Sequence, residues 1–310
     1  MSKRKRIQYN ELNEEIYAPK YWTTPRLVVI GFFLLFMGFL VNFSLEEKIN
    51  KYLQTTLGNN TACPIQFEKA ELSYFFPKVI VKNPVIMGAC FGQYNNRLEL
   101  KDIKIAFSSP SFYPVGIRLH VEATSGKSHI NLYPVLSVFS QNVKIEKTII
   151  DTQLFAPMTE TNMSPISGTL SIEGFFEFKS GQVRDGEIAV VSNNFSLPSQ
   201  NIKGFELTQL NLQTLNISAH FSNPQTMVID KIQIGKDKAP IEMNLKGQLH
   251  VRENDFMGSQ LALDGNLKLS QFILVNFAFV KLFLPESNTS GNYKMKVNGP
   301  LRNPGAPQFL

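Results

Sequence analysis

The chain contains 310 residues, of which 43 % are apolar, and its formal net charge is +6. This composition is typical of a folded protein that can bury a core. Half of the charge, +3, precedes residue 27, which leaves only +3 on the remaining 284 residues. A nucleic-acid-binding domain carries a dense basic stripe on a folded face, so we exclude that class and expect no nucleic-acid partner.

The first predicted element is a single transmembrane helix over residues 27–45 (LVVIGFFLLFMGFLVNFSL), which hold no charged residue. At ~1.5 Å per residue such a helix nearly spans a ~30 Å hydrocarbon core. A cleaved signal peptide is the alternative, but it has a shorter apolar core and a small-x-small cleavage site. Because Lys and Arg collect on the cytoplasmic side, we expect residues 1–26 to form a cytoplasmic basic tail and the rest to be exported, across a bacterial inner membrane into the periplasm.

A short amphipathic helix is predicted over residues 46–58, directly after the membrane segment. Leu45, Ile49, Tyr52, Leu53 and Leu57 recur on one helical face, and Gly58 supplies a stop. This helix lies on the membrane surface or closes one end of the domain that follows, and the sequence leaves both readings open.

The only two cysteines, Cys63 and Cys90, both follow the predicted membrane segment. Export places them in an oxidising compartment, so we predict a disulfide between them. Two unrelated buried thiols are the alternative. A zinc site is not expected, because no histidine or further cysteine lies nearby.

Residues 59–310 are predicted to form a periplasmic β-rich domain, because apolar and polar residues alternate along many short runs. The regular runs are 166–178, 241–251, 261–269 and 293–299, and the less regular ones are 98–107, 117–123, 129–133, 143–149, 186–191, 207–221 and 227–234. Turn residues such as Asn223-Pro224 separate them. About a dozen strands joined by short links predict antiparallel meanders.

One apolar helix is predicted near the C-terminus, over residues 272–284 (FILVNFAFVKLFL). This run is too short to cross a bilayer unaided. We expect a mostly buried helix that packs on the sheet or covers its end, and a buried strand pair or a membrane-dipping segment is the alternative.

A many-stranded sheet with one apolar face must cover that face with a second sheet, close into a barrel, or curve into a trough that a hydrophobic ligand fills. The long succession of similar strands, the scarcity of helix, and the 25 Phe and 9 Met residues favour an extended, curved trough. The candidate groove residues are Leu170, Ile172, Phe176, Phe178, Met243, Leu245, Leu249, Leu263, Leu267, Met295 and Val297.

No pattern of catalytic or cofactor-binding residues stands out. His120, His129, His220 and His250 are dispersed along the chain. The sequence contains no nucleophile elbow, zinc-binding H-E-x-x-H pair, phosphate loop or dinucleotide fingerprint. We therefore expect a protein that is not an enzyme and that holds no cofactor or metal.

Residues 291–304 (GNYKMKVNGPLRNP) resemble the closing strand and turn of the type II secretion system protein N family, in its broad version with an AsmA-like periplasmic β-domain. Pro300 stands where that family usually has Thr. Residues 165–170 (PISGTL) and the strand, proline and strand of residues 71–84 are similar to further family segments. The resemblance covers most of residues 27–305.

The resemblance implies a non-catalytic accessory or scaffold component of a type II protein secretion system, anchored in the inner membrane by a single pass. Its expected partners are the membrane and other secretion-system proteins. The first alternative is an AsmA-like periplasmic lipid-binding or lipid-transfer protein, whose trough carries acyl chains. An exported enzyme or sugar-binding sandwich is the second.

Overall fold

The computed structural model describes residues 23–42, 45–60, 63–73, 78–91, 96–112, 114–138, 140–159, 164–179, 182–202, 205–236, 238–252, 255, 258–277, 284–285 and 291–310. The chain divides into two compact units, Met1–Tyr52 and Leu53–Leu310. Residues 1–22, which hold most of the predicted basic tail, lie outside the described residues.

The first unit holds the helix α2 (Thr23–Asn42) and the start of α3 (Leu45–Gly58). The apolar side chains of α2 that the structure describes, such as Leu27, Phe32 and Leu35, are exposed. No helix in the described part of the chain reaches both the length and the apolarity that crossing a membrane requires. The transmembrane segment over residues 27–45, of which 43–44 are not described, therefore stays a prediction.

The predicted amphipathic helix is present as α3, which begins at Leu45 and ends at Gly58. Glu46 and Glu47 lie in its first turn, where carboxylates interact favourably with the positive end of the helix dipole. The sequence prediction of 46–58 was thus correct to within one residue.

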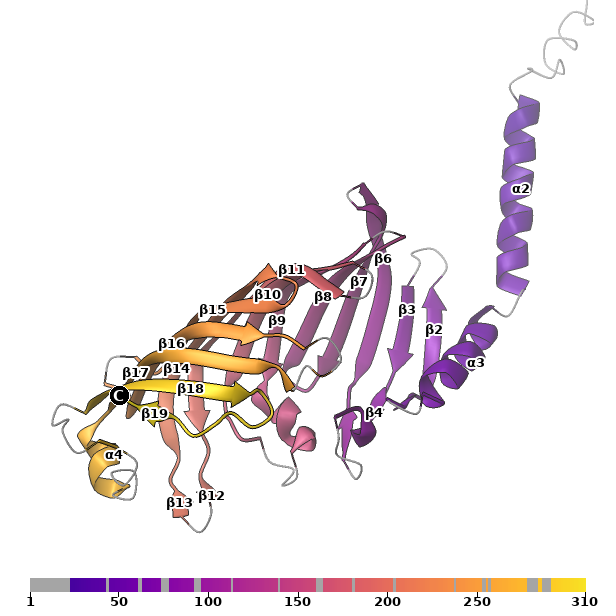
Figure 1. The fold of residues 1–310 in the computed structure, drawn as a ribbon. Helices are drawn as coiled ribbons and strands as arrows, with labels where there is room; N and C mark the ends of the chain where they lie inside the picture. The colour runs from indigo at the N-terminus through magenta and orange to yellow at the C-terminus, as the bar shows by residue number, and fades with distance from the viewer. Residues whose placement is uncertain are drawn as a thin grey trace, which may run out of the picture. The chain divides into compact units, whose positions relative to one another are not determined.

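The second unit is built on one antiparallel sheet of fourteen strands, in the order β19-β18-β17-β16-β15-β14-β11-β10-β9-β8-β7-β6-β3-β2. The strands are β2 (Lys69–Ser73), β3 (Lys78–Lys82), β6 (Asp102–Phe112), β7 (Val115–Ser125), β8 (Ser128–Ser137), β9 (Gln141–Asp151), β10 (Thr169–Lys179), β11 (Gln182–Leu197), β14 (Leu210–Asn223), β15 (Thr226–Ile234), β16 (Ile241–His250), β17 (Gln260–Leu269), β18 (Asn292–Pro300) and β19 (Gln308–Phe309). Figure 1 shows that the sheet is strongly curved. The prediction of a mostly β protein with a large, curved, antiparallel sheet and few helices is confirmed.

Smaller elements lie along one edge of the large sheet. Strands β1 (Ile65–Gln66), β4 (Val85–Met87) and β5 (Arg97–Glu99) form a three-stranded sheet, and β12 (Gln200–Ile202) pairs with β13 (Phe205–Leu207). Two 3-10 helices, η1 (Gly88–Phe91) and η2 (Thr152–Met158), and the helix α4 (Gln271–Asn276) complete the unit. η2, β4 and α4 lie at the lower edge of the sheet in Figure 1.

The predicted disulfide is present. Cys63 and Cys90 are bonded across a sequence separation of 27 residues. Cys63 lies two residues before β1, and Cys90 lies in η1 directly after β4, the strand that pairs with β1. The bond therefore ties the small three-stranded sheet together at one end.

The single predicted strand over residues 98–107 was wrong. It is two strands in two sheets, because the backbone changes partners between β5 and β6. Leu100 N donates a hydrogen bond to Pro84 O, whereas Lys101 N donates to Thr124 O on β7. Leu98 consequently packs with Leu100 and Ala123 in a separate small core.

The predicted helix over residues 272–284 is present at its start as α4, which ends at Asn276, before Phe277. Residues 278–283 lie outside the described part of the chain, so the rest of this prediction stays untested. Ile273 and Phe277 are buried against the sheet, but Phe272 and Val275 are exposed. The helix therefore buries one side and is not mostly buried as expected.

Candidate functional site: the apolar face of the sheet

One row of directly opposed residues crosses thirteen strands of the large sheet without a polar side chain. From β2 to β18 the row is Leu72, Val79, Ile105, Val121, Leu132, Ile145, Gly174, Ile188, Ala219, Ile229, Gly247, Leu263 and Val297. Opposed residues point to the same side of a sheet. With strands ~4.8 Å apart, the row is roughly 55–60 Å long. We call this side of the sheet the apolar face and the other side the polar face.

The register places every groove residue predicted from the sequence on the apolar face. Met243, Leu267 and Tyr293 oppose one another there, as do Leu245, Gly265 and Met295 in the next row. On β10 the same face carries Leu170, Ile172, Phe176 and Phe178, which alternate with side chains of the polar face. The prediction of which residues share a face was therefore correct.

The apolar face is packed most tightly at the β14–β18 end. Leu249 and Leu263 are only 4 % exposed, and Leu245 and Met295 only 6 %. Their buried cluster, with Ala219 and Ile229, comes from the strands of this sheet alone among the described residues. Curvature therefore brings these side chains together, so this end forms a core rather than an open groove.

A second core closes the lower edge of the apolar face. Leu170, Leu215, Leu269 and Tyr293, among others, pack there with Ile273 and Phe277 of the α4 segment. Phe155 of η2 packs against the same cluster. These short elements cover this edge of the sheet.

The stretch from β6 to β10 is the more open part of the apolar face. Phe176 and Phe178 remain half-buried, with ring centroids 6.5 Å apart, and Val143 opposes Phe176 from β9. Phe107 on β6 and Ile117 on β7 are exposed. An apolar ligand or protein segment can therefore reach the face here without displacing a buried core.

Sequence reasoning missed many residues of the apolar face because β-bulges interrupt their strands. On β15 the register shifts between Ile229 and Ile232, so both isoleucines face the same side although they are three residues apart. On β9 the same effect separates Ile145 from Thr148, where Lys147 has a φ of 48°. A bulge inserts one residue and reverses the alternation beyond it. A search of each alternating segment for one inserted residue would have identified these apolar-face residues.

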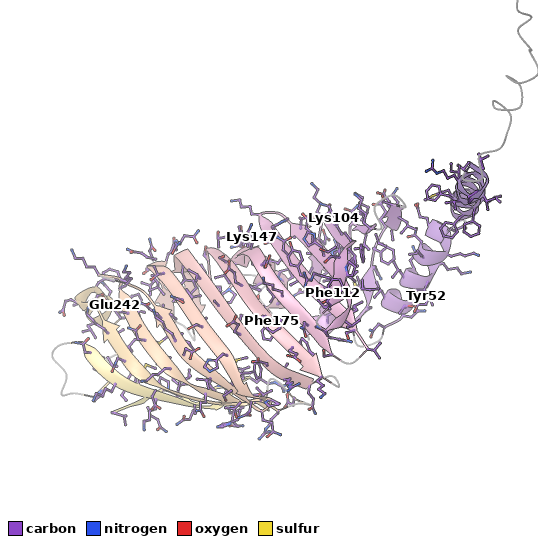
Figure 2. The ribbon with its side chains drawn as sticks, turned by 90° about the horizontal axis from the view of Figure 1, so that it is seen from above. Tyr52, Lys104, Phe112, Lys147, Phe175 and Glu242 are labelled. Atoms are coloured by element: carbon purple, nitrogen blue, oxygen red, sulfur yellow. A yellow bond between two sulfur atoms is a disulfide. The ribbon has the colours of Figure 1, made fainter. Side chains whose placement is uncertain are left out.

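The polar face carries the four histidines and most ion pairs, spread over many strands. His220 Nδ1 lies 2.9 Å from Asp230 Oδ2, and His120 stacks on Tyr133 with ring centroids 4.6 Å apart. Lys268 donates to Glu242, which Figure 2 labels, at 3.0 Å. Such exposed pairs each contribute little to stability. They do not form a cluster that could perform acid–base chemistry.

Two surface carboxyl groups have lowered pKa values. A hydrogen bond from Lys69 holds the pKa of Glu71 below its ordinary value, and a hydrogen bond from Lys144 does the same for Glu146. Both carboxyl groups lie in solvent at the ends of exposed ion pairs. Their shifts therefore reflect surface pairing and not a buried catalytic group.

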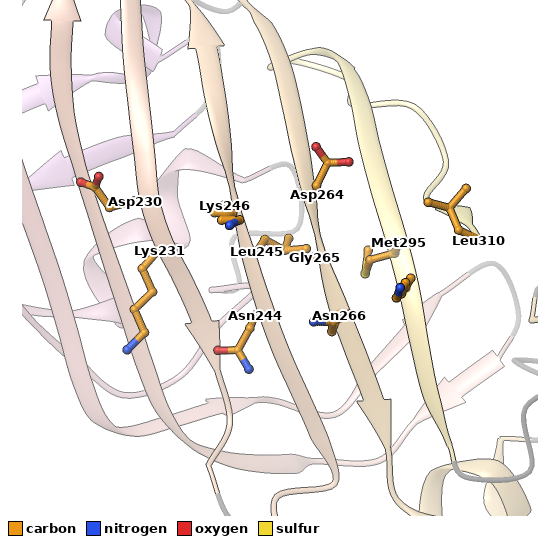
Figure 3. Close-up of a pocket in the computed structure, with 11 residues that line it drawn as sticks. Asp230, Lys231, Asn244, Leu245, Lys246, Asp264, Gly265, Asn266, Met295 and Leu310 are labelled. Carbon is orange, nitrogen blue, oxygen red and sulfur yellow. The ribbon is translucent and has the colours of Figure 1, made fainter.

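The polar face has a hollow of about 400 Å³ above Gly265. Figure 3 shows that its polar side chains come from neighbouring strands and do not converge on one point. Asp264 lies 3.7 Å from Lys296, and Asp230 shares a hydrogen bond with His220, so both carboxylates of the hollow already have a side-chain partner. Within the described residues, no three histidine, cysteine or acidic side chains are grouped so that they could hold a metal ion.

Comparison with known proteins adds no relative. No family model matches the chain, and neither a curated protein nor a solved structure matches it.

Proposed function

We propose that this chain is a non-catalytic accessory component of a type II protein secretion system, anchored in the bacterial inner membrane with its β-domain in the periplasm. The observation that carries the proposal is the apolar row across thirteen strands. The small sheet of β1, β4 and β5 packs only beside this row, where Leu98 contacts Ala123. The open part of the apolar face, from β6 to β10, would dock an apolar segment of another secretion-system protein. The sequence resemblance at residues 291–304 supports the assignment to this machine.

The anchor in this proposal is the uncharged run of residues 27–45, which extends beyond the described end of α2. The exposed apolar side chains of α2 support it, because transfer of these leucine and phenylalanine side chains from water into a bilayer lowers the free energy. The basic residues ahead of the run favour a cytoplasmic N-terminus. The disulfide supports an oxidising compartment for the β-domain.

Deletion of the gene should lower secretion of the host's type II substrates, and the wild-type chain should restore it. Phe176→Gln, on the open apolar face, should restore it poorly, because a polar amide replaces the apolar contact. Phe175→Gln is the matched control, since Phe175 opposes Lys144 and Glu187 on the polar face. The measurement is the amount of each secreted enzyme in the medium. Unchanged secretion in the deletion strain would contradict the proposal.

A second function, binding of lipid acyl chains, is favoured by the composition of the same open stretch. The side chains of Phe176, Phe178 and Val143 are apolar, and acyl chains need no hydrogen-bond partners. In this alternative the trough itself holds or transfers lipid. The two functions differ in what occupies the face of the purified protein.

If the face holds lipid, the purified full-length chain should retain phospholipid in a near-stoichiometric amount, measured by extraction and mass spectrometry. Phe176→Gln should weaken retention about tenfold, equivalent to about half the free energy of fully burying a phenylalanine. Phe175→Gln should retain lipid like the wild type. A chain that carries no lipid above the level of the surrounding detergent or bilayer would reject the second function and leave the docking function standing.

A further inference from the structure

Six large apolar side chains are exposed near the place where β6 and β8 end and β7 begins. We call them the apolar tip: Phe107, Phe112, Val115, Ile117, Leu136 and Val138. Phe112 is 88 % exposed and Val138 is 92 % exposed. Large contiguous apolar patches are rare on the surfaces of soluble proteins, and they mark interaction sites.

Register brings the residues of the apolar tip together. Phe112 opposes Val115 across the β6–β7 hairpin, and Ile117 opposes Leu136 on β8. Among the described residues, β3 reaches only to Ala106 on the other side of β6, so the end of β6 projects beyond its neighbour. Figure 1 shows this hairpin extending past the ends of the adjacent strands. The tip is therefore a protruding feature rather than the wall of a groove.

The surroundings of the tip carry almost no charge. Between Lys104 and Glu122 the only charged side chain is Arg118, and residues 130–143 have none. Arg118 is exposed on the polar face, where it opposes Ser109 and Val135 within a few residues of the tip. An uncharged, protruding end with a single basic residue behind it is complementary to an anionic lipid surface, which attracts cations and accepts apolar side chains.

We propose that the apolar tip inserts into the surface of a lipid bilayer, with Arg118 held at the level of anionic headgroups. A bilayer fits a protruding apolar end, since its acyl region presents no polar groups that would need partners. A protein partner would instead need a concave, shape-complementary pocket around Phe112 and Val138, together with a polar rim. Phe107 and Ile117 also lie on the open part of the apolar face, but the inference rests on Phe112 and Val138 at the strand ends, and not on whether residues 27–45 span a membrane.

The test uses the full-length chain reconstituted in vesicles of phosphatidylethanolamine with phosphatidylglycerol as the anionic lipid. Because Cys63 and Cys90 are bonded to each other, a cysteine introduced by Phe112→Cys or Val138→Cys can be labelled selectively with an environment-sensitive fluorophore. Lys127→Cys is the matched control: it lies in the exposed β7–β8 turn at the opposite end of the same strands. In one arm the quenchers are attached to lipids of the vesicles that hold the protein, and in the other arm to lipids of added vesicles that hold no protein. Insertion of the tip into the protein's own bilayer or into a second bilayer is therefore detected.

We expect labels at positions 112 and 138 to shift to the blue and to be quenched in one arm, and the label at position 127 to do neither. Arg118→Gln should reduce quenching at position 138 in anionic vesicles and have little effect in neutral phosphatidylcholine vesicles. Absence of quenching at 112 and 138 in both arms would overturn the inference. A blue shift without quenching that grows with protein density would also overturn it, because a second copy of the chain would then cover the tip.

Discussion

Replacement of Gly265 by alanine should destabilise the large sheet strongly, because the added methyl group would overlap with the neighbouring strand. A Cβ atom at Gly265 would lie 1.9 Å from Asn244 O and 2.8 Å from the Cα atom of Leu245, both on the adjacent strand β16. Gly247 has the reciprocal arrangement, since its Cβ would lie 2.0 Å from Ala262 O on β17. The obstructing atoms are backbone, so the two strands would have to separate. We expect each alanine variant to lose about 2–3 kcal/mol of unfolding free energy, a fall of roughly 5–10 °C in the melting temperature.

The measurement is thermal or denaturant unfolding of the full-length chain, followed by the circular dichroism of its strands. Gly31→Ala is the control, because a Cβ at Gly31 of α2 would meet nothing within 4 Å. It should leave the sheet transition unchanged. If Gly265→Ala melts like the wild type, the close approach of β16 and β17 at this position is wrong.

Removal of the disulfide should produce the second large effect. The bond closes a loop across 27 residues of sequence separation. In the chain-entropy model, cross-linking a loop of this length stabilises the fold by about 3.5 kcal/mol. We expect Cys63→Ser combined with Cys90→Ser to lose most of this free energy, and the loss should fall first on the small sheet of β1, β4 and β5.

Hydrogen exchange would locate this loss. Amides of β1 and β4 should exchange faster in the double serine variant, whereas those of β16 and β17 should keep their protection. Reductant supplies the internal control, since it should destabilise the wild-type chain and have no effect on the variant. Equal sensitivity of both proteins to reductant would show that the bond is not what holds this corner of the molecule.

The sequence predicted the regular strands and their apolar side well, because there the period of two is unbroken. Leu261, Leu263 and Leu267 of β17 alternate with polar residues or alanine along the strand, and each faces the side that the pattern predicts. The same holds for Tyr293, Met295 and Val297 of β18. The two cysteines were also paired correctly, since no other cysteine competes.

What the sequence missed depends on contacts between segments that are distant along the chain. Bulges such as that between Ile229 and Ile232 arise from the fit of two strands and hide the alternation in each one alone. The extent of burial was missed for a similar reason. Phe176 and Leu245 look alike in their strand patterns, but the curvature of the sheet buries Leu245 and leaves Phe176 accessible. The projection of Phe112 beyond β3 could not be read from the β6–β7 segment, because it depends on where β3 begins.

Most strands of the large sheet pair with the strands directly before and after them in the chain, from β6 to β11 and again from β14 to β19. Pairing between strands that are adjacent in the sequence keeps the sequence separation of paired residues small. This favours rapid folding by successive addition of hairpins. It also makes the sheet modular. Gain or loss of one hairpin would lengthen or shorten the molecule by about 10 Å and leave the remaining pairs in register. The length of the large sheet can therefore be adjusted during evolution in units of one hairpin, without redesign of the rest.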